Sequence, residues 1–155
     1  MRPILISAAT LTCLATATFF LACGSTSALA ADMKFEAMLL WGTNDSTPPA
    51  GKDYKPVSPD VLKKLHELPL KWTNWFVVRS NIFTLGRGET KEVTMSDKCQ
   101  LKLKVIGGND TEVSLIGKGK EVMKRKQALP KTEMLFLGGN APGATAWLVA
   151  LKRLE

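Results

Sequence analysis

The chain has 155 residues and a formal net charge of +7, from 21 Lys and Arg against 14 Asp and Glu. It contains one histidine and three cysteines, two of them within the first 23 residues. The remainder therefore lacks the four Cys or His ligands that a structural zinc site needs. The excess of positive charge favours anionic neighbours such as phospholipid head groups, acidic glycans or an acidic protein surface.

Residues 1–30 have the pattern of a secretory signal peptide. A basic residue near the start is followed by an uncharged apolar run over about residues 4–22. Ala28 and Ala30 then place small side chains where a signal peptidase pocket requires them. We therefore expect cleavage before Ala31 and export of the rest of the chain to the periplasm or the extracellular space.

Two other interpretations of this leader stay open. The residues around Cys23 loosely resemble the lipoprotein box of bacteria, in which a cysteine becomes the lipid-bearing N-terminus. The apolar run is also just long enough for an uncleaved transmembrane anchor, which takes about 20 residues. Either alternative would tether the remaining chain to a membrane through its N-terminal end.

Residues 31–155 suffice for one domain but not comfortably for two, so a single exported β-rich domain is expected. Alternation that gives way to a continuous apolar run predicts a first strand at 33–41. Polar and structure-breaking residues predict a flexible loop at about 42–57. A Ser-Pro-Asp start and a one-sided apolar pattern predict one short helix at about 58–68, ended by Pro69.

From Trp72 onward the pattern indicates short strands separated by turns that contain glycine. The predicted strands lie at 75–78, 82–85, 91–95, 100–105, 121–128, 134–137 and 146–151. Strands repeated at intervals of about ten residues are typical of sandwiches and barrels. The expected fold class is mainly β: a small antiparallel β-sandwich or partly open barrel with one short α-helix.

The strand at 100–105 is expected to form a hairpin with the apolar residues that follow it. A pairing of Val105 with Val113 and of Leu103 with Leu115 keeps the apolar side chains on one face. This register predicts a loop at Gly108–Asp110, whose Gly and Asn tolerate a positive φ. A slip of one residue would turn the apolar set outward.

A basic cluster and the tryptophans are the two candidate binding features. The basic residues that lie close together in sequence are Lys118, Lys120, Lys124, Arg125 and Lys126. They indicate either a patch that docks on an anionic partner or a solvated edge strand whose lysines discourage aggregation. Trp72 and Trp75, at the start of a strand, are candidates for a partly exposed sugar-stacking pair, whereas alternation with Val149 predicts that Trp147 is core.

Catalytic chemistry has little support in the sequence. Cys99, His66 and Asp97 are residue types of a Cys–His hydrolase, but no motif joins them. No catalytic residue, cofactor or metal ligand is predicted. The sequence favours an exported, non-catalytic binding or structural module of the cell envelope that contacts an envelope or secreted protein. An anionic glycan or a membrane surface is a further possible class of partner, whereas export disfavours nucleic acid. The alternative functions are a glycan-binding module and a small hydrolase.

Overall fold

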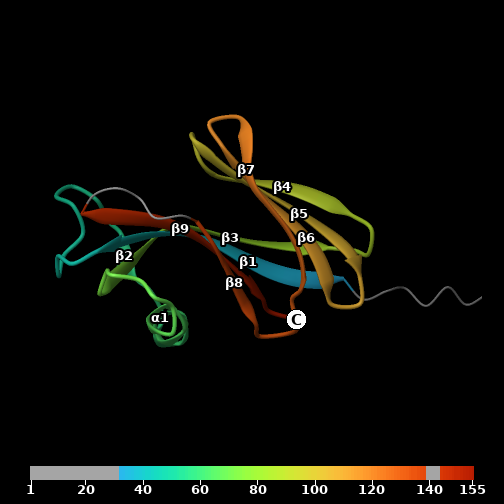
Figure 1. Cartoon of the computed structure of the whole chain (residues 1–155), viewed down its shortest axis with the longest axis horizontal. Helices are drawn as coiled ribbons and strands as arrows, with labels where there is room; N and C mark the ends of the chain where they lie inside the picture. Colours follow the sequence, from blue (N-terminus) through green and yellow to red (C-terminus); the bar gives the residue numbers. More distant parts are fainter. Residues whose placement is uncertain (1–31, 139–143) are drawn as a thin grey trace, which may run out of the picture.

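Two antiparallel sheets and one short helix form the described part of the chain, residues 32–138 and 144–155 of this computed structural model (Figure 1). The larger sheet has the strand order β2-β3-β1-β9-β8, and the smaller sheet has the order β4-β5-β6-β7. Neither sheet closes into a barrel within these residues, so the predicted mainly β, sandwich-like class is confirmed. The elements are β1 (Met33–Thr43), β2 (Lys55–Pro56), α1 (Pro59–His66), β3 (Asn74–Leu85), β4 (Thr90–Ser96), β5 (Cys99–Gly107), β6 (Asp110–Gly117), β7 (Lys120–Ala128), β8 (Met134–Leu137) and β9 (Thr145–Arg153).

The central strand β1 buries side chains on both of its faces. Phe35 and Leu39 pack into the cluster between the two sheets, while Met38 and Leu40 pack into a second cluster beneath α1. Successive side chains of a strand point to opposite sides of the sheet. A strand that is covered on both sides therefore has a continuous run of apolar residues in its sequence. The result is three layers, with the larger sheet between the smaller sheet and α1 (Figure 1).

The helix α1 is anchored to the larger sheet by apolar packing and by one ion pair. Val61 and Leu65 are buried against the sheet. The Lys152 ammonium, together with the Ser58 hydroxyl, lowers the pKa of Asp60 to about 2. The helix covers Pro59–His66 and is shorter than the predicted 58–68: Ser58 is an extended N-cap residue, Glu67 is the C-cap, and the residue before Pro69 is disfavoured in helical conformation.

Strand β3 is one continuous strand of 12 residues, so the prediction of separate strands at 75–78 and 82–85 is wrong. The polar residues between these segments stay in the ladder, since Arg79 still pairs with Leu39 of β1. The next pair is Val77 with Leu40, which leaves Val78 as an extra, unpaired residue. Such a β-bulge bends the strand locally and re-aims a side chain.

The predicted loop at 42–57 is shorter than expected at both ends. Strand β1 extends to Thr43, and Lys55–Pro56 forms the two-residue strand β2 against β3. The Asn44 side-chain carbonyl accepts a hydrogen bond from the backbone N–H of Thr73 at 3.0 Å, which ties the start of the loop to β3. The stretch outside strands is therefore 44–54.

The hairpin of β5 and β6 has a different register from the predicted one. Leu103 pairs with Val113, and Leu101 pairs with Leu115, a shift of two residues. The turn is tighter than predicted because Gly108 adopts a φ of +58°, a left-handed conformation that glycine accepts without steric cost. The shift keeps the same residues facing the core, since the strand period is two.

One end of the sandwich is closed by a buried arginine. Arg153, which is 7% exposed, donates from its guanidinium to the Asn109 side-chain oxygen at 2.7 Å and to the Leu129 carbonyl at 3.1 Å. The Leu129 N–H in turn donates to the Asn109 carbonyl at 2.7 Å. These bonds link β9 of the larger sheet to the turn of the smaller sheet, so the sheets are held together at this end.

Candidate functional site

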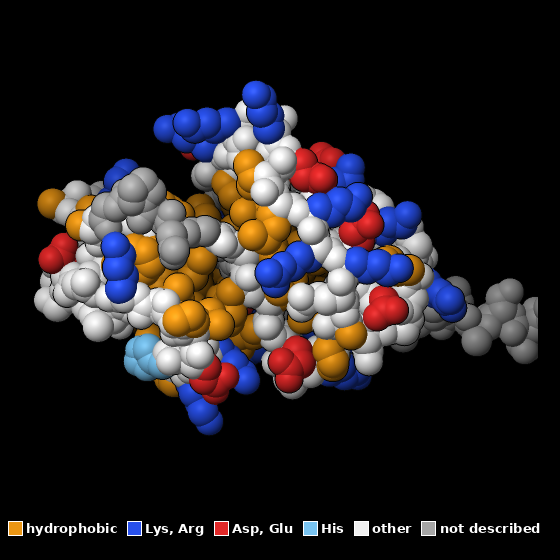
Figure 2. Space-filling view, viewed as in Figure 1, with side chains coloured by type: hydrophobic (Ala, Val, Ile, Leu, Met, Phe, Trp, Pro, Cys, Tyr) orange, Lys and Arg blue, Asp and Glu red, His pale blue; other side chains and the backbone are white. Residues whose placement is uncertain are grey.

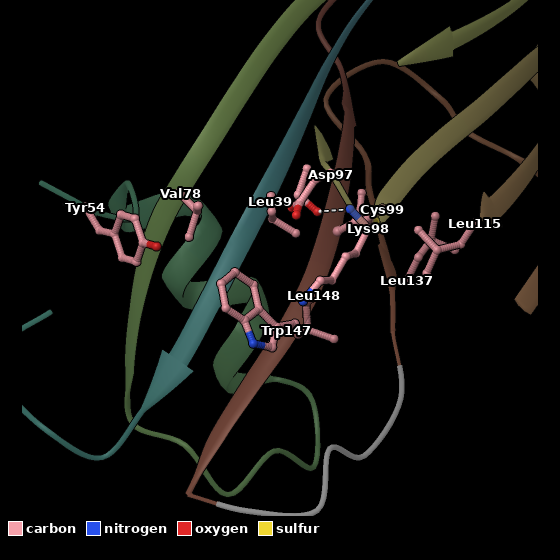
Figure 3. A pocket seen from close by; sticks show the side chains of 12 residues that line it. Leu39, Tyr54, Val78, Asp97, Lys98, Cys99, Leu115, Leu137, Trp147 and Leu148 are labelled. Carbon is pink, nitrogen blue, oxygen red and sulfur yellow. Dashed lines mark hydrogen bonds between the residues drawn. The ribbon is translucent and has the colours of Figure 1, made fainter. Parts of the chain in front are cut away.

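Among residues 32–138 and 144–155, the opposite end of the sandwich is open and contains a cleft of about 560 Å³ between the two sheets (Figure 3). Its lining combines apolar side chains from both sheets with a short polar turn at the mouth. The lining residues are Leu39, Tyr54, Val78, Ser96, Asp97, Lys98, Cys99, Leu115, Leu137, Trp147, Leu148 and Val149. Figure 2 shows apolar side chains gathered in a hollow on this face of the molecule. We call this feature the cleft.

The cleft has a buried floor and more exposed walls. Leu39, Leu137 and Val149 are buried and form the floor, because their strands turn these side chains toward the smaller sheet. Val78 and Leu115 are half-buried and belong to opposing sheets. The bulge in β3 is what brings Val78 to the inner face beside the cleft.

Trp147 lies at the mouth of the cleft and is 46% exposed, so the prediction that it belongs to the core is wrong. Alternation does place it on the inner face, in register with Trp41 of β1. Trp147 lies outside the cluster between the sheets, because this end of the larger sheet extends beyond the smaller sheet (Figure 1). Trp41 itself is 7% exposed, and its ring packs against those of Tyr54 and Phe76, with centroids 6.2 Å and 5.9 Å away.

Trp72 and Trp75 are buried, at 4% and 3% exposure, and the expectation that they are partly exposed is wrong. Both pack in the cluster beneath α1, on the far side of the larger sheet from the cleft. The Trp72 indole N–H donates to the Ala144 carbonyl at 3.0 Å, and that of Trp75 donates to the Trp72 carbonyl at 3.3 Å. Their ring faces are therefore not available for stacking against a sugar.

The predicted basic cluster does not form a single patch. Strand β7 is an edge strand of the smaller sheet, as the solvated-edge interpretation requires. Lys124 forms an ion pair with Glu112 at 3.0 Å on the outer face, which raises the pKa of the lysine. Lys126 alternates onto the same face, whereas Arg125 lies on the opposite one.

Lys118 lies instead in the β6–β7 turn, and Lys120 is the first residue of β7, both at the open end of the sandwich. The Lys118 N–H donates to the Lys98 carbonyl at 2.9 Å, which joins this turn to the β4–β5 turn. Lys98 lines the cleft, and its side chain extends from this turn toward the strand that carries Trp147 (Figure 3). We call these three lysines the basic rim.

The basic rim could not be found from sequence clustering alone. Lys98 precedes Lys118 by 20 positions and belongs to a different turn. The only signal is that both turns connect strands of one meander, in which alternate turns lie at the same end of the sheet. Asp97, next to Lys98, is the one carboxylate among the residues that line the cleft.

The structure does not bring Cys99, His66 and Asp97 together. Cys99 lines the cleft, and burial raises the pKa of its thiol, so it stays protonated and uncharged at neutral pH. His66 lies on α1, beyond the larger sheet. Within the described ranges, no group of three or more His, Cys, Asp or Glu side chains is placed to hold a metal ion.

Comparison with protein-family models, with curated proteins and with solved structures gave no match. In the part of the chain that the structure describes, no helix has the length and apolar character needed to cross a bilayer.

Proposed function

We propose that this protein is an exported, non-catalytic binding module that takes an apolar group of its ligand into the cleft. The observation that carries the proposal is the exposed Trp147 above a floor of Leu39, Leu137 and Val149. Apolar surface left uncovered at one place usually marks a binding site. A volume of about 560 Å³ lies within the ordinary range of ligand pockets, about 300–1,000 Å³.

The chemistry of the cleft supports binding over catalysis. Two of its side chains are of types that serve in acid–base or nucleophilic catalysis. Asp97 is exposed, and burial raises the pKa of the Cys99 thiol. A nucleophilic thiol needs an adjacent base or a lowered pKa. The sequence offers His66 as that base, but the larger sheet separates its helix from the Cys99 thiol.

A protein partner docked on β7 is the second candidate. This strand lies at the edge of the smaller sheet, where an extended peptide of an envelope or secreted protein would add as a further strand. Lys124, Arg125 and Lys126 oppose such pairing unless the added strand is acidic. The glycan-binding alternative loses its main support with the burial of Trp72 and Trp75.

Replacing Trp147 with serine should weaken binding of an apolar probe at least about tenfold, because the largest exposed apolar side chain of the cleft is removed. The measurement is a fluorescence titration of the purified protein with Nile red, a neutral dye. Ile82→Ser is the matched control, since Ile82 is 60% exposed on β3 but does not line the cleft. Equal loss in both variants, or no saturable binding at all, would contradict the proposal.

Export predicts a definite N-terminus. The protein recovered from the periplasm or medium of its native host should have the intact mass of a chain that begins at Ala31, because Ala28 and Ala30 suit the peptidase pocket. Intact mass spectrometry makes the measurement. A mass that fits a chain beginning at diacylglycerol-modified Cys23 would establish the lipoprotein alternative instead.

A further inference from the structure

We propose that the ligand of the cleft is a single acyl chain with an anionic head group. This inference rests on the proposed function and names the chemical class of its ligand. The acyl chain would lie between the sheets on the apolar floor, and its head group would stay at the mouth beside the basic rim. Two features of the described residues support this orientation, the separation of apolar from polar lining and the charge of the rim.

The lining of the cleft is divided along its depth. Leu39, Leu137 and Val149 at the floor present only hydrocarbon, and Leu115 continues this surface onto the smaller sheet. Cys99 adds a neutral thiol, which behaves as a small apolar group. A narrow hydrocarbon chain meets such a surface with no polar group left unpaired, whereas a sugar would lose hydrogen bonds to water there.

The charge beside the mouth is suited to an anion, because Lys98 lines the cleft and the hairpin that carries Lys118 and Lys120 is bonded to the Lys98 carbonyl. Lys98, Lys118 and Lys120 are exposed, and the ion pairs among the described residues involve none of them. Two other lysines of the smaller sheet are paired, Lys102 with Glu92 at 3.2 Å and Lys124 with Glu112 at 3.0 Å. Asp97 offsets only part of this positive charge.

The shape favours a single detached chain over docking on a bilayer surface. Insertion into a bilayer needs several apolar side chains that project from the protein, but Trp147 is the one large apolar side chain of the described lining that is exposed, and the floor residues Leu39 and Val149 are 4% and 2% exposed. A ligand that contacts them has to enter between the larger and the smaller sheet, as one acyl chain can. A fatty acid or an anionic lysophospholipid has this shape and a negative head group.

The test compares laurate with monolaurin, which has the same acyl chain and an uncharged head group. Both ligands are titrated into the purified protein by isothermal calorimetry at pH 8, below their micelle concentrations and at low salt. The rim variant combines Lys98→Gln, Lys118→Gln and Lys120→Gln. The matched control combines Lys102→Gln, Lys104→Gln and Lys126→Gln, which removes the same charge from the outer face of the same sheet.

Laurate should bind one to one and more tightly than monolaurin. The rim variant should lose about tenfold in laurate affinity but keep its monolaurin affinity, because three exposed charge interactions each contribute modestly. The control variant should bind both ligands as the unchanged protein does, and high salt should reduce the preference for laurate.

The two proposals fail in different ways. Equal affinity for laurate and monolaurin, or a rim variant that keeps its laurate affinity, would overturn the anionic ligand but leave apolar binding in the cleft intact. Binding of neither ligand would overturn both proposals and would direct attention to the edge strand β7.

Discussion

Replacing Leu103 with alanine should lower the free energy of unfolding by about 2–5 kcal/mol, the range observed for buried Leu→Ala substitutions. Leu103 is completely buried in the cluster between the two sheets, where it pairs with Val113. Truncation removes buried methyl groups and leaves a cavity that two packed sheets fill only in part. The closed end of the sandwich, held by Arg153, limits how far the sheets can move together.

Urea denaturation measures this loss as a shift of the transition midpoint at constant slope. Lys104→Ala is the matched control, because Lys104 is the next residue on the same strand but faces solvent. That variant should stay within about 0.5 kcal/mol of the unchanged protein. An unshifted midpoint for Leu103→Ala would mean that the side chain is not part of a packed core.

Replacing Trp75 with alanine should lower the free energy of unfolding by about 3–5 kcal/mol. The indole is 3% exposed and packs edge-on against Trp72, with ring centroids 6.2 Å apart. It also covers Gly42 of β1 so closely that a Cβ there would lie 2.6 Å from the ring. Only glycine leaves room for the ring, so the two positions form one packing unit beneath α1.

Thermal or urea unfolding followed by circular dichroism measures this effect, and a glycan-binding assay on the same sample separates stability from recognition. Lys71→Ala is the control. Lys71 is exposed and its ammonium lies 5.0 Å from the centroid of the Trp72 ring, so this variant changes the surface beside the tryptophans but leaves their buried packing in place. A Trp75→Ala variant with unchanged stability but lost glycan binding would contradict the buried role and support the sugar-binding alternative.

The fold class could be predicted because strand alternation is local information. Residues such as Leu101 and Leu103 are assigned to a face by their spacing alone, and the structure places both in the core. The register in which two strands pair, in contrast, is not determined by the spacing of residues within one strand. A shift of two residues preserves every face, so the pattern could not distinguish Val113 from Leu115 as the partner of Leu103.

The cleft could not be predicted because alternation shows which way a side chain points but not what covers it. Trp147 points to the inner face, as its spacing with Val149 indicates, yet no strand of the smaller sheet extends over it. Its position after a helix that ends at a proline predicts that Trp75 is partly exposed, but the helix packs over it. Both assignments depend on where elements end in space, which requires the packed structure.

The bulge at Val78 determines which face of the larger sheet each aromatic residue of β3 reaches. Trp75 and Phe83 are separated by an even number of residues, which in an unbroken strand would put both on one face. The extra residue reverses the alternation between them, so Trp75 reaches the helix-side cluster and Phe83 reaches the cluster between the sheets. A deletion of one residue here would force one of these aromatic rings to exchange sides. The length of this strand is therefore as closely tied to its packing as the type of residue at each position.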